Sequence, residues 1–210
     1  MSSKKYRVAV FASGSGTNAE EIFKYFKSHS SIEVVLLASN NPGAYALQRA
    51  ENHHIKNAVF SRKEFQDGTL IRKLLEDARV THIVLAGFLW LIPDYLLKAF
   101  PDRIINIHPA LLPKYGGKGM YGAKVHEAVR ASGEKETGIT IHLVNERYDE
   151  GRILFQGKCS IEENYSPEDI AACVHELEHK YYPRVIEGWI LKEVEDSPRS
   201  TVHGPRTEDQ

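Results

Sequence analysis

The sequence lacks several features that define large classes of proteins. Its only two cysteines, Cys159 and Cys173, are well separated and form no C-x-x-C pattern, so a disulfide framework or thiolate zinc site is not expected and both are predicted to be free thiols. Neither the polar N-terminal residues nor any later stretch supplies the long apolar run of a signal peptide or membrane span. The formal net charge is −1, which gives no basic surface for nucleic acid or anionic lipid. We therefore expect a cytoplasmic protein whose partners are small molecules.

Hydrophobic residues are present in quantity, at 42% of the 210 residues. This composition suits one domain with a sizeable core. Residues 1–192 are predicted to form that domain. Residues 193–210 are polar and show no periodicity, which predicts a loose C-terminal tail.

Short apolar runs alternate with stretches of helical periodicity along the chain. Residues 32–39 (IEVVLLAS) are apolar almost without alternation, as in a parallel strand covered on both faces. The repeated order predicts an α/β fold, a Rossmann-like, doubly wound and mostly parallel sheet with helices on both faces. The predicted strands are 7–12, 32–39, 57–60, 81–86, 103–108, 140–144 and 153–160. The predicted helices are 19–26, 44–52, one within 63–79, 93–99, 126–131 and a long one after Ser166-Pro167.

A glycine loop, residues 13–18 (SGSGTN), joins the first predicted strand to the first helix. Glycines let the backbone approach an anion, and a helix N-terminus favours negative charge, so the loop predicts a phosphate ligand. Gly14-x-Gly16-x-x-Ala19 also matches a relaxed dinucleotide fingerprint, but the next strand ends in Ser39-Asn40-Asn41 rather than the acidic residue that would hold a ribose. A tight turn with no ligand is the other interpretation.

Asn106 and His108 alternate with isoleucines on a predicted strand, so their side chains point to one face while Ile105 and Ile107 enter the core. An amide donor beside an imidazole suits acyl transfer, which needs a stabilised oxyanion and a proton moved near neutral pH. An isolated histidine is also often an ordinary hydrogen-bonded side chain.

Asp149 lies in a turn-like run, residues 148–151 (YDEG), after the strand 140–144. An aspartate there is commonly a solvated turn former. If the loop folds back over the preceding strand end, Asp149 pairs with His108 and raises the pKa of that imidazole. Thr140 and His142 alternate on the neighbouring strand and are candidates for supporting the same cleft, although a core role suits a strand histidine equally.

At these residues the sequence resembles the phosphoribosylglycinamide formyltransferase family, whose members act in de novo purine synthesis. The resemblance runs from about residue 7 to residue 189. It is carried by residues 13–18, 85–88 (LAGF), 106–115 (NIHPALLPKY), 148–151 and Glu178-His179.

The resemblance implies transfer of a formyl group from 10-formyltetrahydrofolate to the amine of glycinamide ribonucleotide, with no metal. It implies that the N-terminal half binds the ribonucleotide and the C-terminal half binds folate and carries the chemistry. The implied catalytic residues are Asn106, His108 and Asp149. The implied ribonucleotide-binding residues are Gly16, Thr17, Asn18, His175 and Glu178. The implied folate-binding residues are Arg62, Leu89, Trp90, Leu91, Ile92, Asn106, Asn145, Glu146, Arg147, Tyr148 and Asp149.

Residues 115–122 (YGGKGMYG) form a glycine-rich loop that is longer than the family pattern, and Trp90 occupies a position where that pattern has arginine. The glycines permit the mobility of a lid, although a plain flexible insertion explains them as well.

Other functions compete with this assignment. A metal-dependent hydrolase could be drawn from His108, His126, His142 and Asp149, but none of these shows H-E-x-x-H spacing. A non-catalytic nucleotide-binding module would bind a phosphate ligand without any transfer. Related formyl enzymes that act on tRNA or hydrolyse the folate carry a further domain, for which this chain has no room.

Overall fold

A computed structural model gives the structure of the protein for residues 5–191. The tail predicted for residues 193–210 lies outside the described residues. Seven strands form one sheet in the order β3-β2-β1-β4-β5-β6-β7. The first five of these are mutually parallel. At one edge β6 pairs antiparallel with β5, and β7 pairs antiparallel with β6. The strands are β1 (Tyr6–Phe11), β2 (Ile32–Ser39), β3 (Asn57–Val59), β4 (His82–Leu85), β5 (Ile104–His108), β6 (Glu136–Leu143) and β7 (Ile153–Ser160).

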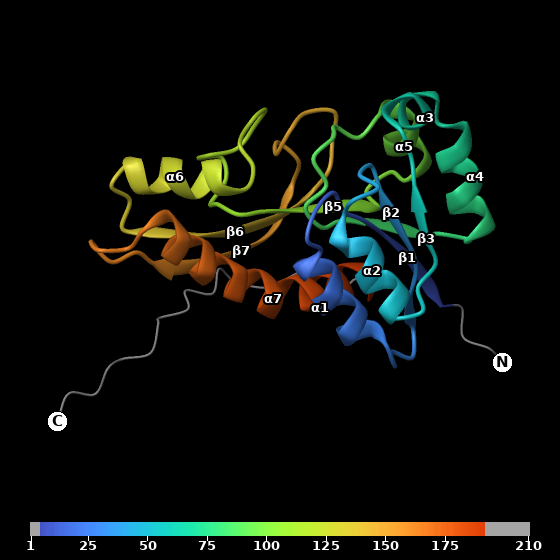
Figure 1. The fold of residues 1–210 in the computed structure, drawn as a ribbon, viewed down its shortest axis with the longest axis horizontal. Coiled ribbons are helices and arrows are strands. Elements are labelled where there is room, and N and C mark those ends of the chain that lie inside the picture. The colour runs from blue at the N-terminus through green and yellow to red at the C-terminus, as the bar shows by residue number, and fades with distance from the viewer. Residues whose placement is uncertain (1–4, 192–210) are drawn as a thin grey trace.

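Helices cover both faces of this sheet (Figure 1). One hydrophobic cluster joins the sheet to α1, α2, α6 and α7, and a second joins it to α3, α4 and α5. The predicted doubly wound α/β fold is confirmed. The helices are α1 (Thr17–Phe26), α2 (Tyr45–Asn52), α3 (Arg62–Asp67), α4 (Thr69–Asp77), α5 (Asp94–Ala99), α6 (Ala123–Ala131) and α7 (Pro167–Leu191).

The single helix predicted within residues 63–79 is two helices, because the chain turns at Gly68. Its φ of +80° is left-handed, and a Cβ there would lie 2.8 Å from the ring of Tyr95. Glycine is the residue that tolerates both conditions. The periodicity of the flanking residues continues across the break, which is why the sequence pattern reads as one element.

The long helix α7 packs against the sheet and against the end of β4. Helical spacing in the sequence predicts a core-facing stripe that ends in Tyr181, Val185 and Trp189. In the structure these three are partly buried against the core, and the most deeply buried residues of the last turns are Tyr182, Ile186 and Ile190, each one position further along. The hydroxyl of Tyr182, which is fully buried, donates to the carbonyl oxygen of Leu85 at 2.8 Å. This contact fixes α7 against the strand that ends at the site.

The prediction of free thiols for Cys159 and Cys173 is wrong in this structure. β7 and α7 pack together and bring the two residues, 14 apart in the chain, to a Cα–Cα distance of 6.7 Å, where their sulfur atoms are bonded. Sequence spacing alone did not reveal the proximity, because it arises from packing of a helix on an edge strand.

Among residues 5–191, no helix combines the length and the apolar character that crossing a membrane requires.

Candidate active site

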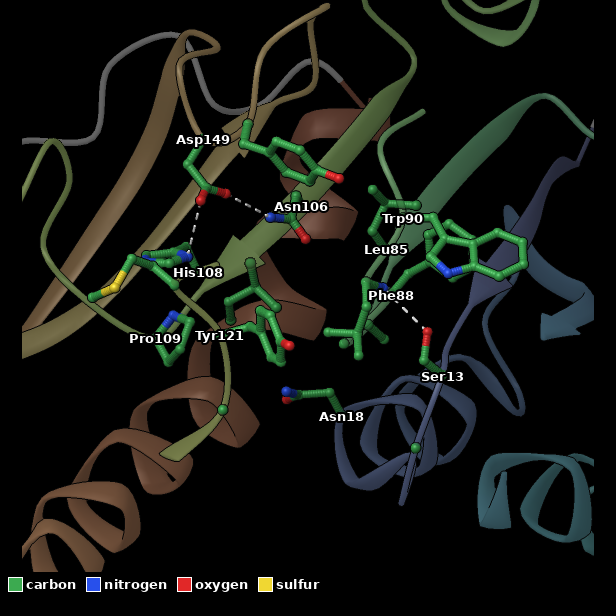
Figure 2. Close-up of a pocket in the computed structure, with 18 of the residues that line it drawn as sticks. Ser13, Asn18, Leu85, Phe88, Trp90, Asn106, His108, Pro109, Tyr121 and Asp149 are labelled. Carbon is green, nitrogen blue, oxygen red and sulfur yellow. Dashed lines mark hydrogen bonds and ion pairs between the residues drawn. The ribbon is translucent and has the colours of Figure 1, made fainter. Parts of the chain in front are cut away.

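The chain reverses its winding direction at β1, whose neighbours β2 and β4 lie on opposite sides. Ligands of open α/β sheets bind at the carboxyl ends of strands at such a point. A cavity of about 670 Å³ lies there, a volume that suits small-molecule ligands. It is lined by residues 13–18 after β1, by residues 85–92 and 106–109 at and beyond the ends of β4 and β5, by residues 117–122 and 147–149, and by His175 and Glu178 of α7. Figure 2 shows Asn106, His108 and Asp149 on one side of this cavity, with Ser13 and Trp90 on the other.

The glycine loop approaches α2 so closely that a side chain is excluded at Gly16. This residue is the N-cap of α1 with a φ of +71°, and a Cβ there would lie 2.6 Å from the Cβ of Ala46. The predicted strand-loop-helix arrangement is therefore present, with the N-terminus of a ten-residue helix at the cavity. Such a terminus favours an anion.

Gly16→Ala should destabilise the protein by about 2 kcal/mol or more, because it combines a left-handed φ with overpacking against backbone. Gly14→Ala is the matched control in the same loop, since its φ is not positive and no described atom lies within 4 Å of its Cβ position. We expect this control to stay within about 1 kcal/mol of wild type. Urea unfolding measures both changes, and equal losses would contradict the close approach of α1 and α2.

Ser13 connects the glycine loop after β1 to the segments that follow β2 and β4. The sequence did not suggest this role. The Ser13 hydroxyl donates to Asn40 Oδ1 at 2.6 Å. It also accepts from the backbone N–H of Leu89 at 3.1 Å, the contact drawn as a dashed line from Ser13 in Figure 2. The start of the glycine loop thus holds the segment that follows β4. In the sequence Ser13 is simply a serine at the end of a strand, and serines at strand ends make many different contacts.

All the residues implied for ribonucleotide binding line this cavity. Asn18 Nδ2 donates to Glu178 Oε2 at 3.0 Å, and His175 Nε2 lies 3.9 Å from the same oxygen. Burial raises the pKa of Glu178, although the contacts with Asn18 and His175 act in the opposite direction. His126, whose pKa burial lowers to about 4, also lines the cavity and was not among the predicted binding residues.

Asn106 and His108 face the cavity, and Ile105 and Ile107 lie in the core, as predicted. The antiparallel neighbour β6 places His142 opposite Asn106 and Thr140 opposite His108. The register therefore explains why the alternating residues of the two strands gather at one place.

The loop that carries Asp149 folds back over the end of β5, the position that its predicted pairing with His108 requires. One carboxylate oxygen, Oδ2, accepts from the backbone N–H of Gly117 at 2.9 Å and lies 3.5 Å from His108 Nδ1. The other, Oδ1, lies 3.5 Å from Asn106 Nδ2 and 3.6 Å from His142 Nε2. Burial acts to raise the pKa of Asp149, but His142, His108 and the Gly117 N–H together lower it. The carboxylate is thus ionised in the free protein near neutral pH.

The predicted rise in the pKa of His108 is not found, because the ring is 3% exposed and burial lowers its pKa. The charge of Asp149 and the carbonyl of Tyr115 act to raise it but do not overcome burial, and His142 lowers it further. The pairing of Asp149 with His108 is present, and its effect on the pKa has the predicted sign. The sequence could not show how deeply the ring would be enclosed.

His142 orients the amide of Asn106. Its Nδ1 lies 2.8 Å from the carbonyl oxygen of Leu143, so this nitrogen carries the proton and donates. In a neutral ring Nε2 is then an acceptor, and it lies 3.2 Å from Asn106 Nδ2. Thr140, fully buried, holds the chain beyond β5 instead, donating to Ala110 O at 2.7 Å and accepting from Leu112 N at 2.9 Å.

The residues implied for folate binding divide between two adjoining cavities. Leu89, Trp90, Leu91, Ile92, Asn106, Arg147, Tyr148 and Asp149 line the main one. Arg62 and Glu146 line a smaller cavity of about 250 Å³ that shares Trp90, Leu91 and Ile92 with it. The Arg62 guanidinium lies 5.1 Å from the centre of the Trp90 ring. Asn145 lines neither cavity, and its side chain accepts from the backbone N–H of Arg147 at 3.0 Å.

Within residues 5–191, no three histidine, cysteine, aspartate or glutamate side chains are grouped so that they could hold a metal ion. His108 and His142 instead each lie beside Asp149 and contact a main-chain carbonyl oxygen.

Comparisons with known proteins identify the family of this chain. The formyl transferase family model matches residues 6–186. A chloroplastic phosphoribosylglycinamide formyltransferase of Arabidopsis thaliana is 43% identical over 189 residues, which cover 87% of this chain and 65% of that protein. The Bacillus subtilis phosphoribosylglycinamide formyltransferase is 40% identical over 186 residues, covering 86% of this chain and 93% of that protein.

A solved structure shows the same fold. The phosphoribosylglycinamide formyltransferase of Bacillus halodurans has a TM-score of 0.80 and 35% sequence identity, and the match covers 89% of this chain and 96% of that one. The match covers 65% of the length of the Arabidopsis relative, which is less than two thirds. This chain nevertheless accounts for nearly all of the Bacillus proteins. The chain therefore belongs to the formyl transferase family, in the group of the phosphoribosylglycinamide formyltransferases.

Proposed function

We propose that the protein transfers the formyl group of 10-formyltetrahydrofolate to the amine of glycinamide ribonucleotide, giving formylglycinamide ribonucleotide and tetrahydrofolate in de novo purine synthesis. The observation that carries this proposal is one cavity lined both by the glycine loop at the N-terminus of α1, where an anion would be favoured, and by Asn106, His108 and Asp149. The names of the relatives from Arabidopsis and Bacillus support it.

In this proposal residues 1–192 are one domain in which each half serves one substrate. Gly16, Thr17 and Asn18 bind the ribonucleotide phosphate, and His175 and Glu178 lie where the rest of the ribonucleotide would extend. The folate lies between residues 89–92 and residues 145–149, with its anionic tail toward Arg62. The folate is a co-substrate, and the reaction needs no metal, nucleic acid or membrane.

The chemistry uses the three central side chains. The amine nitrogen bonds to the formyl carbon, and the carbonyl electrons move onto oxygen, where Asn106 Nδ2 stabilises the negative charge. His108 Nδ1, on the side of Asp149, takes one proton from the attacking nitrogen and becomes an imidazolium that Asp149 and the oxyanion both stabilise. When the bond to N10 of the folate breaks, that proton passes to N10. One proton and one formyl group thus exchange places.

Glu178→Gln should raise the KM for the ribonucleotide by about tenfold or more, because a buried carboxylate accepts hydroxyl hydrogen bonds more strongly than an amide. The KM for the folate should be nearly unchanged. Glu176→Gln, on the exposed side of the same helix, is the matched control and should behave as wild type. Steady-state kinetics with each substrate varied in turn measures both. An unchanged ribonucleotide KM in Glu178→Gln would remove this residue from the binding site.

The function is tested by mixing the protein with glycinamide ribonucleotide and 10-formyltetrahydrofolate and following the absorbance change as the folate loses its formyl group. The reaction should depend on the ribonucleotide. Loss of the formyl group without the ribonucleotide would indicate a hydrolase, and binding without loss would indicate a nucleotide-binding module.

We further propose the cytoplasm as the location of the protein. The Bacillus subtilis relative supports this location, whereas the Arabidopsis relative is named as chloroplastic. Cell fractionation with a tagged protein tests it.

A further inference from the structure

The glycine-rich loop after β5 contacts two of the three central side chains through its main chain. The carbonyl oxygen of Tyr115 lies 2.7 Å from His108 Nε2, and the N–H of Gly117 donates to Asp149 Oδ2 at 2.9 Å. Residues 115–117 thus contact both the His108 imidazole, through a carbonyl oxygen, and the Asp149 carboxylate, through an N–H.

The backbone conformation at these positions is unusual. Tyr115 and Asp149 have φ values of +57° and +60°, in the left-handed region that non-glycine residues seldom adopt, and Gly117 has a φ of +93°. Each of these residues makes one of the contacts just described. Left-handed residues of this kind cost energy and persist where the surrounding structure requires them.

The two contacts of the His108 ring determine which nitrogen carries the proton. A neutral imidazole has one N–H and one acceptor nitrogen, while a carbonyl oxygen can only accept. Since Tyr115 O is 2.7 Å from Nε2 and Asp149 Oδ2 is 3.5 Å from Nδ1, the shorter contact places the proton on Nε2. Nδ1 then keeps its lone pair on the side of Asp149. Without the Tyr115 carbonyl, the carboxylate would be the stronger acceptor and would draw the proton to Nδ1 instead.

We propose that the main chain of residues 115–117 positions the catalytic machinery, with Tyr115 O fixing the Nε2–H tautomer of His108 and Gly117 N holding Asp149, so that Nδ1 is the nitrogen that accepts the substrate proton. This proposal rests on the proposed formyl transfer. Gly117 is accordingly a positioning residue. Its N–H holds Asp149, and its backbone conformation keeps the loop on the path that places the Tyr115 carbonyl beside His108.

Other charged and titratable groups also face this pair. His142 of β6 lies 3.6 Å from Asp149, and His126 of α6 interacts electrostatically with His108. Neither accepts the proton of His108 Nε2, so neither can replace the Tyr115 carbonyl in fixing the tautomer.

Two substitutions displace the loop by different routes. Gly117→Ala disfavours the φ of +93°, and Gly116→Ala introduces a Cβ 2.5 Å from Leu112 Cδ2 and 3.3 Å from Asp149 Cβ. Gly119→Ala is the matched control, because its φ is also +93° and, as at Gly117, no described atom lies within 4 Å of the added Cβ. A general effect of stiffening this loop would appear in all three variants.

The decisive measurement is the ¹⁵N NMR spectrum of the His108 ring in the full-length free protein, at a pH where the ring is neutral. Wild type and Gly119→Ala should show the proton on Nε2. Gly117→Ala and Gly116→Ala should show a shift toward the Nδ1–H tautomer, and their kcat should fall by about tenfold or more while both KM values change little. Two variants are used so that the test survives if one fails to fold.

A proton on Nδ1 in wild type, or an unchanged Nε2–H tautomer in both loop variants, would overturn the proposal. The same tautomer shift in Gly119→Ala would also overturn it, since the contacts of residues 115–117 would then not be the cause. Because the spectrum requires no substrate, it tests the positioning even if wild type fails to transfer formyl groups, which would instead refute the proposed function.

Discussion

Asn106→Ala is expected to lower kcat by about a hundredfold or more while the protein stays folded. Asn106 Nδ2 is the side-chain amide donor proposed to meet the negative charge on the formyl oxygen. Removal of one such donor costs roughly two to three orders of magnitude in other acyl-transfer enzymes. The side chain is only partly buried, and the neighbouring isoleucines keep β5 in the core, so the fold should tolerate its loss.

Pre-steady-state and steady-state kinetics measure this effect, with circular dichroism and urea unfolding as checks on the fold. Asn52→Ala, which removes the same side chain from an exposed position on α2, is the matched control and should retain full activity. Near-normal turnover of folded Asn106→Ala would show that the oxyanion is stabilised elsewhere.

Asp149→Asn is expected to lower kcat by about two to four orders of magnitude, because His108 loses the charge that stabilises its protonated form. The pH dependence follows from the same contact. Asp149 raises the pKa of His108 against the effect of burial, so its removal lowers that pKa further. Since the neutral ring accepts the proton, activity falls as the pH drops through the pKa of His108. The acidic limb of the kcat profile should therefore move to lower pH in Asp149→Asn.

The control for this variant is Asp102→Asn, an exposed aspartate whose φ of +55° resembles the +60° of Asp149. It tests whether the exchange of aspartate for asparagine in a left-handed turn has any effect by itself, and it should leave kcat and the pH profile unchanged. An unaltered acidic limb in Asp149→Asn would argue that this carboxylate does not act on His108.

Local patterns predicted the sheet well because most of the inner parallel strands are short apolar runs that pack on both faces. The run at residues 32–39 has the observed bounds of β2. The antiparallel edge strand β7 also has its predicted bounds, residues 153–160. The break at Gly68 was missed because it depends on the distant ring of Tyr95, and the Cys159–Cys173 pairing because it depends on how α7 lies over β7.

The candidate site likewise contains residues that local patterns predict and residues that depend on the assembled fold. Alternation on one strand was enough to place Asn106 and His108 on a common face. The pairing of Asp149 with His108 could be stated only as a condition on the path of the loop until the family resemblance implied it, because a turn aspartate carries no local signal. The contacts through Tyr115 O and Gly117 N had no signal at all, since main-chain groups are the same in every residue. The burial that lowers the pKa of His108 is likewise a property of the assembled fold.

The reaction proposed for this protein moves the formyl group from the folate to the amine of the ribonucleotide. The most direct test uses 10-formyltetrahydrofolate labelled with ¹³C in the formyl group and follows both products by mass spectrometry in wild type and in Asn106→Ala. We predict that labelled formylglycinamide ribonucleotide accumulates in step with tetrahydrofolate in wild type, and far more slowly in the variant. Release of labelled formate with no labelled ribonucleotide would contradict the account.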